Sequence, residues 1–314
     1  MTKHLNKHMS YLILTPDGVG STILQRLITM TLYLENHNVM NTHELTNGIG
    51  LHKGIAVKRF ELEYSQSLDE ITHILQNSQK QTTLVSRMAK YHLDNRKDPV
   101  DDYKRFYAFL DQHFVKKIMC VRENIFEYAM SWSIRDKSGI LNVYDQNDRD
   151  RVLRVSEVDE KKFIEKCQQY VKYVEWAERN FSHIETASYE NMIKNSDQVM
   201  EKLTGHRNTF TRKVGIPLSS ILANEYRFLK EGKKSNLTND QLKSLARYKI
   251  ICEEMISNNL IISVPLKNTT LSDKKKQIKN FDDCLDKFYT FAKNHNWIDQ
   301  SKATYDFWSE EHIC

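Results

Sequence analysis

Short apolar runs alternate with amphipathic stretches along most of the chain, and this alternation limits the fold more than any other feature. Between the runs, apolar residues recur at intervals of three and four, which is the spacing of a helix with one buried face. Strands separated by helices pair in parallel, because the chain must cross back over the sheet between them. We therefore predict an α/β protein with a central parallel sheet flanked by helices. The predicted strands are Tyr11–Leu14, Val39–Leu45, Thr82–Ser86, Val115–Val121 and Ile184–Ser188.

The first predicted strand leads into a loop with two glycines and then into a helix that begins at Ser21. Glycine lets the backbone turn tightly and approach a ligand, while the start of a helix offers unpaired N–H groups and a partial positive charge. The hydroxyl groups of Ser21 and Thr22 add to these donors. This pattern predicts a binding site for phosphate or sulfate, although an ordinary strand-to-helix turn with a Ser/Thr cap reads the same. The segment is Thr15-Pro16-Asp17-Gly18-Val19-Gly20-Ser21-Thr22.

The loop differs from the Walker A motif of nucleotide-binding proteins. GxxxxGK[ST] has a lysine before the hydroxyl residue, whereas Gly20 stands in that place here. A strand–loop–helix unit at the start of a parallel sheet still predicts a three-layer P-loop-like fold, with a mainly helical C-terminal region. We expect residues 1–217 to form a nucleotide-binding core and residues 218–314 to form a helical C-terminal extension of the same domain.

The bulk composition argues against several classes of protein. The formal net charge of +5 suits a basic cleft for a polyanionic small molecule and is too small to predict nucleic-acid binding. No apolar stretch approaches the ~20 residues of a membrane span, so we expect a cytoplasmic protein without a membrane partner. Five scattered cysteines without a CxxC pair predict neither a disulfide framework nor a zinc site. The run Lys274-Lys275-Lys276 is interpreted as a solvated helical face.

The segment Gly20-Ser21-Thr22-Ile23-Leu24-Gln25-Arg26-Leu27 resembles the loop and first helix of the sulfotransferase superfamily, whose donor is PAPS (3′-phosphoadenosine-5′-phosphosulfate). Bacterial and phage-encoded members are the most similar in the form of this loop. The resemblance implies that Gly18, Gly20, Ser21 and Thr22 bind the 5′-phosphate of the donor, and that PAP is the nucleotide product.

One residue of the family's loop has no counterpart in this chain. The family carries a Lys or Arg there, which contacts the bridging oxygen of the leaving group. Here the loop is one residue longer, and Asp17 or Gly18 stands at that place. Lys53, Arg87 and Lys90 lie near predicted strand ends and are the candidates to supply the missing cation.

Three further segments match the family in order along the chain. Arg122 and Ser131, after the fourth predicted strand, resemble the Arg and Ser that clamp the 3′-phosphate, at a spacing one residue longer than usual. Arginine suits this role because its planar fork binds phosphate oxygens in pairs. Tyr189 in Tyr189-Glu190-Asn191-Met192 resembles the residue near the adenine ring. Arg212 and Lys213 resemble a late basic segment that reaches the 3′-phosphate. A surface charge, a core tyrosine and a solvated turn are the corresponding alternatives.

Two residues at predicted strand ends are candidates for the general base. Sulfuryl transfer requires a group that takes a proton from the acceptor hydroxyl or amine. Glu44 resembles the catalytic Glu of many bacterial and carbohydrate sulfotransferases, and His92 resembles the His of the cytosolic small-molecule enzymes. Glu44 fits better, because the first loop also resembles the bacterial type. The chemistry requires no metal.

Three hypotheses follow for the function. The first is a PAPS-dependent sulfotransferase that acts on a hydroxyl or amine acceptor, in the cytoplasm of a bacterium or of a phage-infected host cell. The second is a catalytically weak or inactive protein of the same fold with a structural or interaction role, including a phage virion-associated one. The third is a P-loop nucleotide kinase, which the absent Walker lysine disfavours. The acceptor and the oligomeric state are not encoded in any motif that we recognise.

Overall fold

The computed structural model describes residues 9–16, 18–47, 51–52, 55–56, 67–78, 82–94, 96–140, 146–222, 238–258, 260 and 274–295. The chain forms two compact units, each made of two separate segments. The first unit contains residues 1–121 and 176–266, and the second contains residues 122–175 and 267–314. The predicted division into a core of residues 1–217 and an extension of residues 218–314 stays a prediction.

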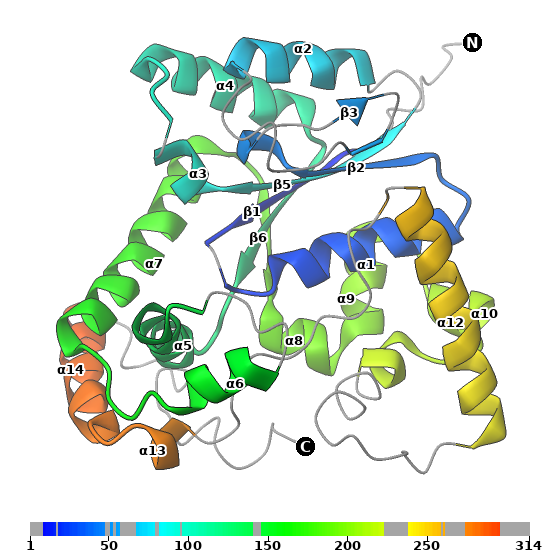
Figure 1. Cartoon of the computed structure of the whole chain (residues 1–314). Helices are drawn as coiled ribbons and strands as arrows, with labels where there is room; N and C mark the ends of the chain where they lie inside the picture. The colour runs from blue at the N-terminus through cyan, green and yellow to red at the C-terminus, as the bar shows by residue number, and fades with distance from the viewer. Residues whose placement is uncertain are drawn as a thin grey trace. The chain divides into compact units, whose positions relative to one another are not determined.

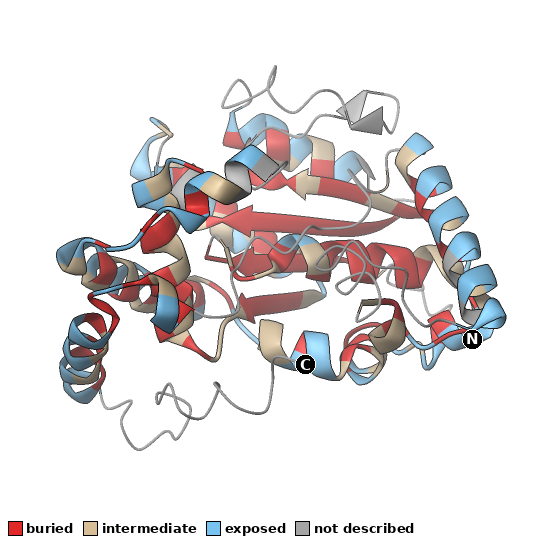
Figure 2. Cartoon of the chain, turned by 60° about the horizontal axis from the view of Figure 1, so that its bottom comes forward, coloured by how far each residue is buried: buried red, intermediate tan, exposed pale blue. Residues whose placement is uncertain are grey.

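The first unit is built around a five-stranded parallel sheet. Its strands are β1 (Tyr11–Thr15), β2 (Val39–Glu44), β5 (Thr83–Ala89), β6 (Lys116–Val121) and β7 (Ile184–Ser188). The strand order is β2-β5-β1-β6-β7 (Figure 1), which confirms the predicted α/β fold with a central parallel sheet. The central β1 and its neighbour β5 are buried along their whole length (Figure 2). Both strands are therefore covered on both sides, as parallel strands between two helical layers are.

Helices lie on both faces of this sheet. α1 (Ser21–Leu34) follows β1 and contacts β1, β2 and β5 on one face. α2 (Leu68–Ser78) and α4 (Val100–His113) pack together on the opposite face (Figure 1). The chain thus leaves β1 toward one face and leaves the neighbouring β5 toward the other. Ligands of open α/β sheets bind at such a point, outside the carboxyl ends of the two strands.

The remaining described elements of the first unit are short, apart from one helix near its C-terminal end. α8, α9 and α10 lie on the same side of the sheet as α1, and α1 contacts both α9 and α10. The short β3 and β4 form an antiparallel pair. These elements are η1 (Leu45–Asn47), β3 (Leu51–His52), β4 (Ile55–Ala56), α3 (Lys90–Asp94), α8 (Tyr189–Lys194), α9 (Ser196–Thr204), α10 (Thr209–Lys213) and α12 (Asn239–Ser257).

Capping residues set the starts of several helices. The Ser67 N–H donates to Glu70 Oε2 at 2.7 Å, and the Glu70 N–H donates to Ser67 Oγ at 3.1 Å. This reciprocal pair is a capping box, and it fixes the start of α2. Pro99 precedes the first residue of α4, where its fixed φ and missing N–H carry no penalty. The Ser188 hydroxyl accepts a hydrogen bond from the Asn191 N–H and caps α8 directly after β7.

The second unit is helical in its described part and has an aromatic core. Phe126 lies at its centre and contacts the rings of Phe163, Phe281 and Phe288, with ring centroids 5.1 to 5.5 Å apart. Two of these rings belong to the last described helix, so residues near the C-terminus form part of this core. The elements are α5 (Ile125–Ser138), α6 (Gln146–Leu153), the first part of α7 (Glu160–Asn180), α13 (Lys274–Gln277) and α14 (Phe281–Asn294). Among the described residues, no helix combines the length and apolar character that a bilayer crossing requires.

Candidate anion-binding site

The loop after β1 has the backbone conformation that its two glycines predict. Gly18 and Gly20 have φ values of 79° and 83°, in the left-handed region that favours glycine. The Gly20 carbonyl accepts hydrogen bonds from the N–H groups of Ile23 (3.0 Å) and Leu24 (3.1 Å), so Gly20 forms the start of α1. A Cβ atom on Gly20 would lie 2.4 Å from Cδ2 of Tyr189. The loop and Tyr189 are therefore in direct contact, and only glycine fits between them.

The first turn of α1 offers donors at the carboxyl edge of the sheet. No side chain in the described part of the protein caps this helix, and the first N–H groups of an α-helix have no partner within the helix. Ser21 is buried, whereas Thr22 is exposed. Their hydroxyl groups lie beside the main-chain donors. This end of α1 therefore has the composition of an anion-binding site.

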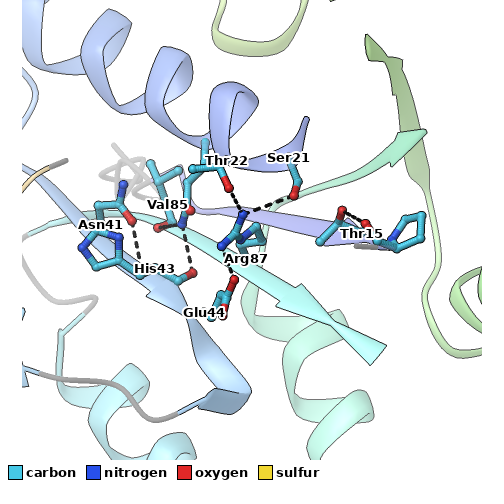
Figure 3. Close-up of polar contacts among 10 residues, drawn as sticks. Thr15, Ser21, Thr22, Asn41, His43, Glu44, Val85 and Arg87 are labelled. Atoms are coloured by element: carbon cyan, nitrogen blue, oxygen red, sulfur yellow. Dashed lines mark hydrogen bonds and ion pairs between the residues drawn. The ribbon is translucent and has the colours of Figure 1, made fainter. Parts of the chain in front are cut away.

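Arg87 of β5 brings a cation to this loop. Its Nη1 donates to Ser21 Oγ at 3.2 Å and also to Thr22 Oγ1 (Figure 3). Its Nη2 forms an ion pair with Glu44 at the end of β2. Only 8% of the Arg87 side chain is exposed, and the Nε atom is buried without a hydrogen-bond acceptor among the described residues. The positive charge that the loop itself lacks is supplied from the neighbouring strand.

Of the other two candidate cations, only Lys90 is described, and it pairs elsewhere. Lys90 Nζ lies 2.6 Å from Asp94 Oδ1 within the short α3, where both side chains are partly exposed. Lys53 lies outside the described residues. Of the three basic residues that the sequence suggested, Arg87 is the one that the structure places at Ser21 and Thr22.

A bulge in β2 determines which side chain meets Arg87. The pairing of β2 with β5 shifts between Asn41 and His43, so Glu44 rather than His43 is opposite Arg87. Asn41 and Glu44 are three residues apart, and in a regular strand they would point to opposite faces. Both interact on the α1 face, because the bulge adds one residue between them. The carboxylate therefore reaches the loop only through this irregularity.

Side chains from α1 support the bulge. His43 has a φ of 54°, which is uncommon for a residue other than glycine. Its N–H donates to Asn41 Oδ1 at 2.8 Å, and its carbonyl accepts from Gln25 Nε2 at 3.0 Å. Gln25 Nε2 also donates to the Val85 carbonyl at 3.3 Å (Figure 3). Asn41 Nδ2 donates to Thr29 Oγ1 at 3.1 Å. Strained backbone that is held by such a network is common at functional sites.

The second candidate base, His92, lies in α3, a few residues after Arg87. Its side chain lies outside what the structure describes. Glu44 is thus the candidate base for which the structure defines an environment. It is buried, it is ion-paired with Arg87, and it lies at the carboxyl end of a strand.

Arg122 and Ser131 belong to the second unit, and their described contacts are within it. Tyr170 Oη accepts from the Arg122 N–H at 3.0 Å and donates to the Arg122 carbonyl at 2.9 Å. Ser131 Oγ accepts a hydrogen bond from Lys274 Nζ at 2.8 Å. Lys274 also forms an ion pair with Glu127. The joint action of Arg122 and Ser131 on a 3′-phosphate stays a prediction.

Lys274 corrects the interpretation of the lysine run as a solvated face. Only 4% of its side chain is exposed, although Lys275 next to it is exposed. Burial lowers the pKa of Lys274, Glu127 opposes this effect, and the charges of Arg122 and Arg135 add to it. The sequence gives no sign of this, because the partners of Lys274 are more than 140 positions away.

Arg212 and Lys213 lie away from the loop. Arg212 Nη2 lies 2.5 Å from Glu35 Oε1, and Glu35 is the C-terminal cap of α1. The loop is at the N-terminal end of this helix of 14 residues, about 21 Å away along its axis. The structure therefore brings Tyr189 and Arg87 to the loop but leaves the late basic segment at the other end of α1.

The geometry defines a candidate class of site, namely a helix N-terminus suited to an anion at the switch point of a parallel sheet, with one buried cation and one buried carboxylate. Searches with protein-family models and against curated proteins find no match to this chain. Within the described residues, no three His, Cys, Asp or Glu side chains come together as the ligands of a metal ion would. The chemistry of the site is therefore the basis for assigning a function.

Proposed function

We propose that the chain is a PAPS-dependent sulfotransferase that transfers a sulfuryl group to a hydroxyl or amine acceptor. The observation that carries the proposal is the hydrogen bonding of Arg87 to Ser21 and Thr22 at the start of α1. Helix N–H groups, two hydroxyls and a guanidinium are the donors that phosphate and sulfate oxygens accept. PAPS supplies an activated sulfuryl group, and the residues at the loop would bind its phosphosulfate end.

Each group of the site has a step to perform in this reaction. An oxygen or nitrogen of the acceptor bonds to sulfur as the bond from sulfur to the bridging oxygen breaks, and PAP leaves with the electron pair. Glu44 would accept the proton that the acceptor loses. Arg87, Ser21 and Thr22 would stabilise the negative charge that develops on the leaving oxygen. Arg87 thereby replaces the loop cation of the family that the chain resembles.

The contact of Tyr189 with Gly20 supports the choice of a nucleotide. A tyrosine beside an anion-binding loop is positioned to contact the sugar or base attached to a bound phosphate, and aromatic rings stack on any base. Arg122 follows the last residue of β6, the strand next to β1. It is the proposed partner of the 3′-phosphate, together with Ser131.

A second candidate function is a non-catalytic structural or interaction role, including a virion-associated one. The observation that favours it is the ion pair between Arg87 and Glu44, because a buried carboxylate on the only cation described at the loop can serve stability alone. A nucleotide kinase is a weaker candidate, since no lysine precedes Ser21 in the loop.

Binding and turnover experiments separate these candidates. We expect PAP to raise the melting temperature of the full chain, by a linkage of about 2.7 kcal/mol at 100 times its dissociation constant. Arg87→Gln should lose most of this response, whereas Arg105→Gln, on the exposed surface of α4, should keep it. Labelled PAPS and a panel of hydroxyl and amine acceptors should then give a sulfated product. A response to ATP alone would favour the kinase, and no response to either nucleotide would favour the structural role.

A further inference from the structure

We infer that Glu44 is ion-paired with Arg87 when no donor is bound, and that the anionic donor displaces it. Binding of the donor would thereby release the carboxylate that acts as the base. The base role rests on the proposed function. The exchange itself requires only that an anion binds at the start of α1.

The first step of the argument is that one guanidinium serves both groups. Nη1 of Arg87 is engaged by the hydroxyls of Ser21 and Thr22, and Nη2 is engaged by Glu44. An oxyanion that accepts hydrogen bonds from those hydroxyls would also meet Nη1. Arginine binds phosphate and sulfate best through two parallel N–H donors. The bidentate contact that includes Nη2 is open to the anion only if Glu44 moves away.

Burial makes this exchange energetically coupled. The side chains of Arg87 and Glu44 are each only 8% exposed. A buried charge is costly unless it is paired, so the empty site is best satisfied with Glu44 on Arg87. A doubly charged anion at the loop, together with the Glu44 carboxylate, would place three negative charges around the single positive charge of Arg87. Two anionic groups in one buried site repel each other, and a carboxylate in that situation moves away or binds a proton more readily. Both outcomes favour a general base.

The bulge allows the carboxylate to move while the backbone stays in place. Two hydrogen bonds hold the backbone of His43, directly before Glu44: Gln25 donates to its carbonyl, and its N–H donates to the Asn41 side chain. β2 lies at the edge of the described sheet and, among the described strands, pairs with β5 alone. A rotation of the Glu44 side chain is therefore enough for the exchange, and no strand pairing has to break.

The test is the sign of the change in PAP affinity when the carboxylate is removed. A ligand that must displace Glu44 binds only to the fraction of molecules in which Arg87 is not paired with Glu44. Its apparent dissociation constant is the intrinsic one divided by that fraction. If Glu44 occupies Arg87 about nine tenths of the time, Glu44→Gln should bind PAP about tenfold more tightly by calorimetry. The same variant should lose transfer from PAPS. Glu35→Gln is the matched control, because it breaks a second Glu–Arg pair at the other end of α1 and should leave PAP affinity unchanged.

Weaker or unchanged PAP binding by Glu44→Gln would overturn the exchange. If Glu44→Gln does not fold, Glu44→Asp keeps the charge but shortens the side chain, and it should also bind PAP more tightly than the wild-type protein. Unchanged affinity in Glu44→Asp would then overturn the inference. Tighter PAP binding in a protein that never transfers sulfate would preserve the exchange and refute the sulfotransferase proposal. Sulfuryl transfer by the wild-type protein, with no tighter PAP binding in the Glu44 variants, would support the sulfotransferase proposal and refute the exchange.

Discussion

The charged side chain of Arg87 is largely buried, between the loop after β1, which has no cation of its own, and the Glu44 carboxylate with which it is ion-paired. Its three described partners come from the start of α1 and from the end of β2. Charged residues in such positions are retained when they are fully paired, and they are seldom the best solution for stability alone. We therefore interpret Arg87 as a binding residue.

Gly20 allows a prediction at the same scale, because a second glycine provides a matched control. Gly20 and Gly205 have similar φ values of 83° and 77°, but a Cβ on Gly205 would meet nothing within 4 Å. Gly205→Ala should therefore cost only the left-handed strain, about 1 kcal/mol. Gly20→Ala must also displace the ring of Tyr189, and overpacking of this kind adds about 1–3 kcal/mol. Urea unfolding of both variants measures the difference. Equal losses of stability would contradict the contact between Gly20 and Tyr189.

The two variants should also differ in ligand binding. Gly20→Ala changes the proposed anion-binding loop, so we expect it to lose the PAP-induced rise in melting temperature. Gly205→Ala lies at the C-terminal end of α9 and should keep that response. A normal PAP response in Gly20→Ala would mean that the loop is not the binding site.

At the scale of elements, the bulge in β2 is the feature that turns a regular strand end into part of a site. Asn41→Ala removes the acceptor of the His43 N–H and the donor to Thr29. An unsatisfied group of this kind costs about 1–3 kcal/mol. Since the bulge positions Glu44, we also expect a fall in kcat and somewhat tighter PAP binding, in the same direction as for Glu44→Gln. Steady-state kinetics and calorimetry measure both effects.

Thr42→Val is the control for the bulge. The Thr42 hydroxyl donates to Ser86 Oγ at 2.6 Å. Ser86 directly precedes Arg87 in β5, so the Ser86 side chain points to the opposite face of the sheet from that of Arg87. The control should lower stability by about 1 kcal/mol and leave kcat and PAP affinity unchanged. If both variants behave alike, Asn41 is merely structural.

The elements were predictable from the sequence where a local signal was strong, and the site was predictable only in part. The apolar runs of β1 and β5 and the capping box of α2 are local, so their positions follow from periodicity and capping chemistry. The bulge is not local. It is supported by hydrogen bonds between β2 and α1, from Gln25 to the His43 carbonyl and from Asn41 to Thr29, and the sequence of β2 alone does not predict it. Arg87 was one of three candidate cations, because which of them reaches the loop depends on strand order.

Long-range packing also determines the positions of Arg212 and Lys274, which differ from those that the sequence predicts. Arg212 follows a plausible motif, but α10 packs against the C-terminal half of α1 and carries it away from the loop. Lys274 looks solvated in sequence and is buried, because its partners in α5 come from a distant part of the chain. Long-range pairing of this kind is fixed by packing and has no sequence period.

At the scale of the whole molecule, a buried histidine predicts how stability depends on pH. His113 ends α4, and its ring packs against Phe109 and Phe114, with centroids 4.6 and 5.3 Å away. Burial lowers the pKa of His113 to about 4 from its ordinary value of 6.5. The folded protein therefore binds fewer protons than the unfolded chain between these values. Stability should fall as the pH is lowered through 6.5 and continue to fall until about pH 4.

The contribution of His113 can be isolated by replacement with an aromatic residue that does not titrate. His113→Phe should make the decline in the urea midpoint between pH 6.5 and pH 4.5 shallower than in the wild-type protein. A residual slope remains, because burial and the charge of His37 also lower the pKa of His206. His73→Gln, on the exposed side of α2, should keep the full slope. A slope in His113→Phe equal to that of the wild-type protein would show that His113 is not held neutral by the fold.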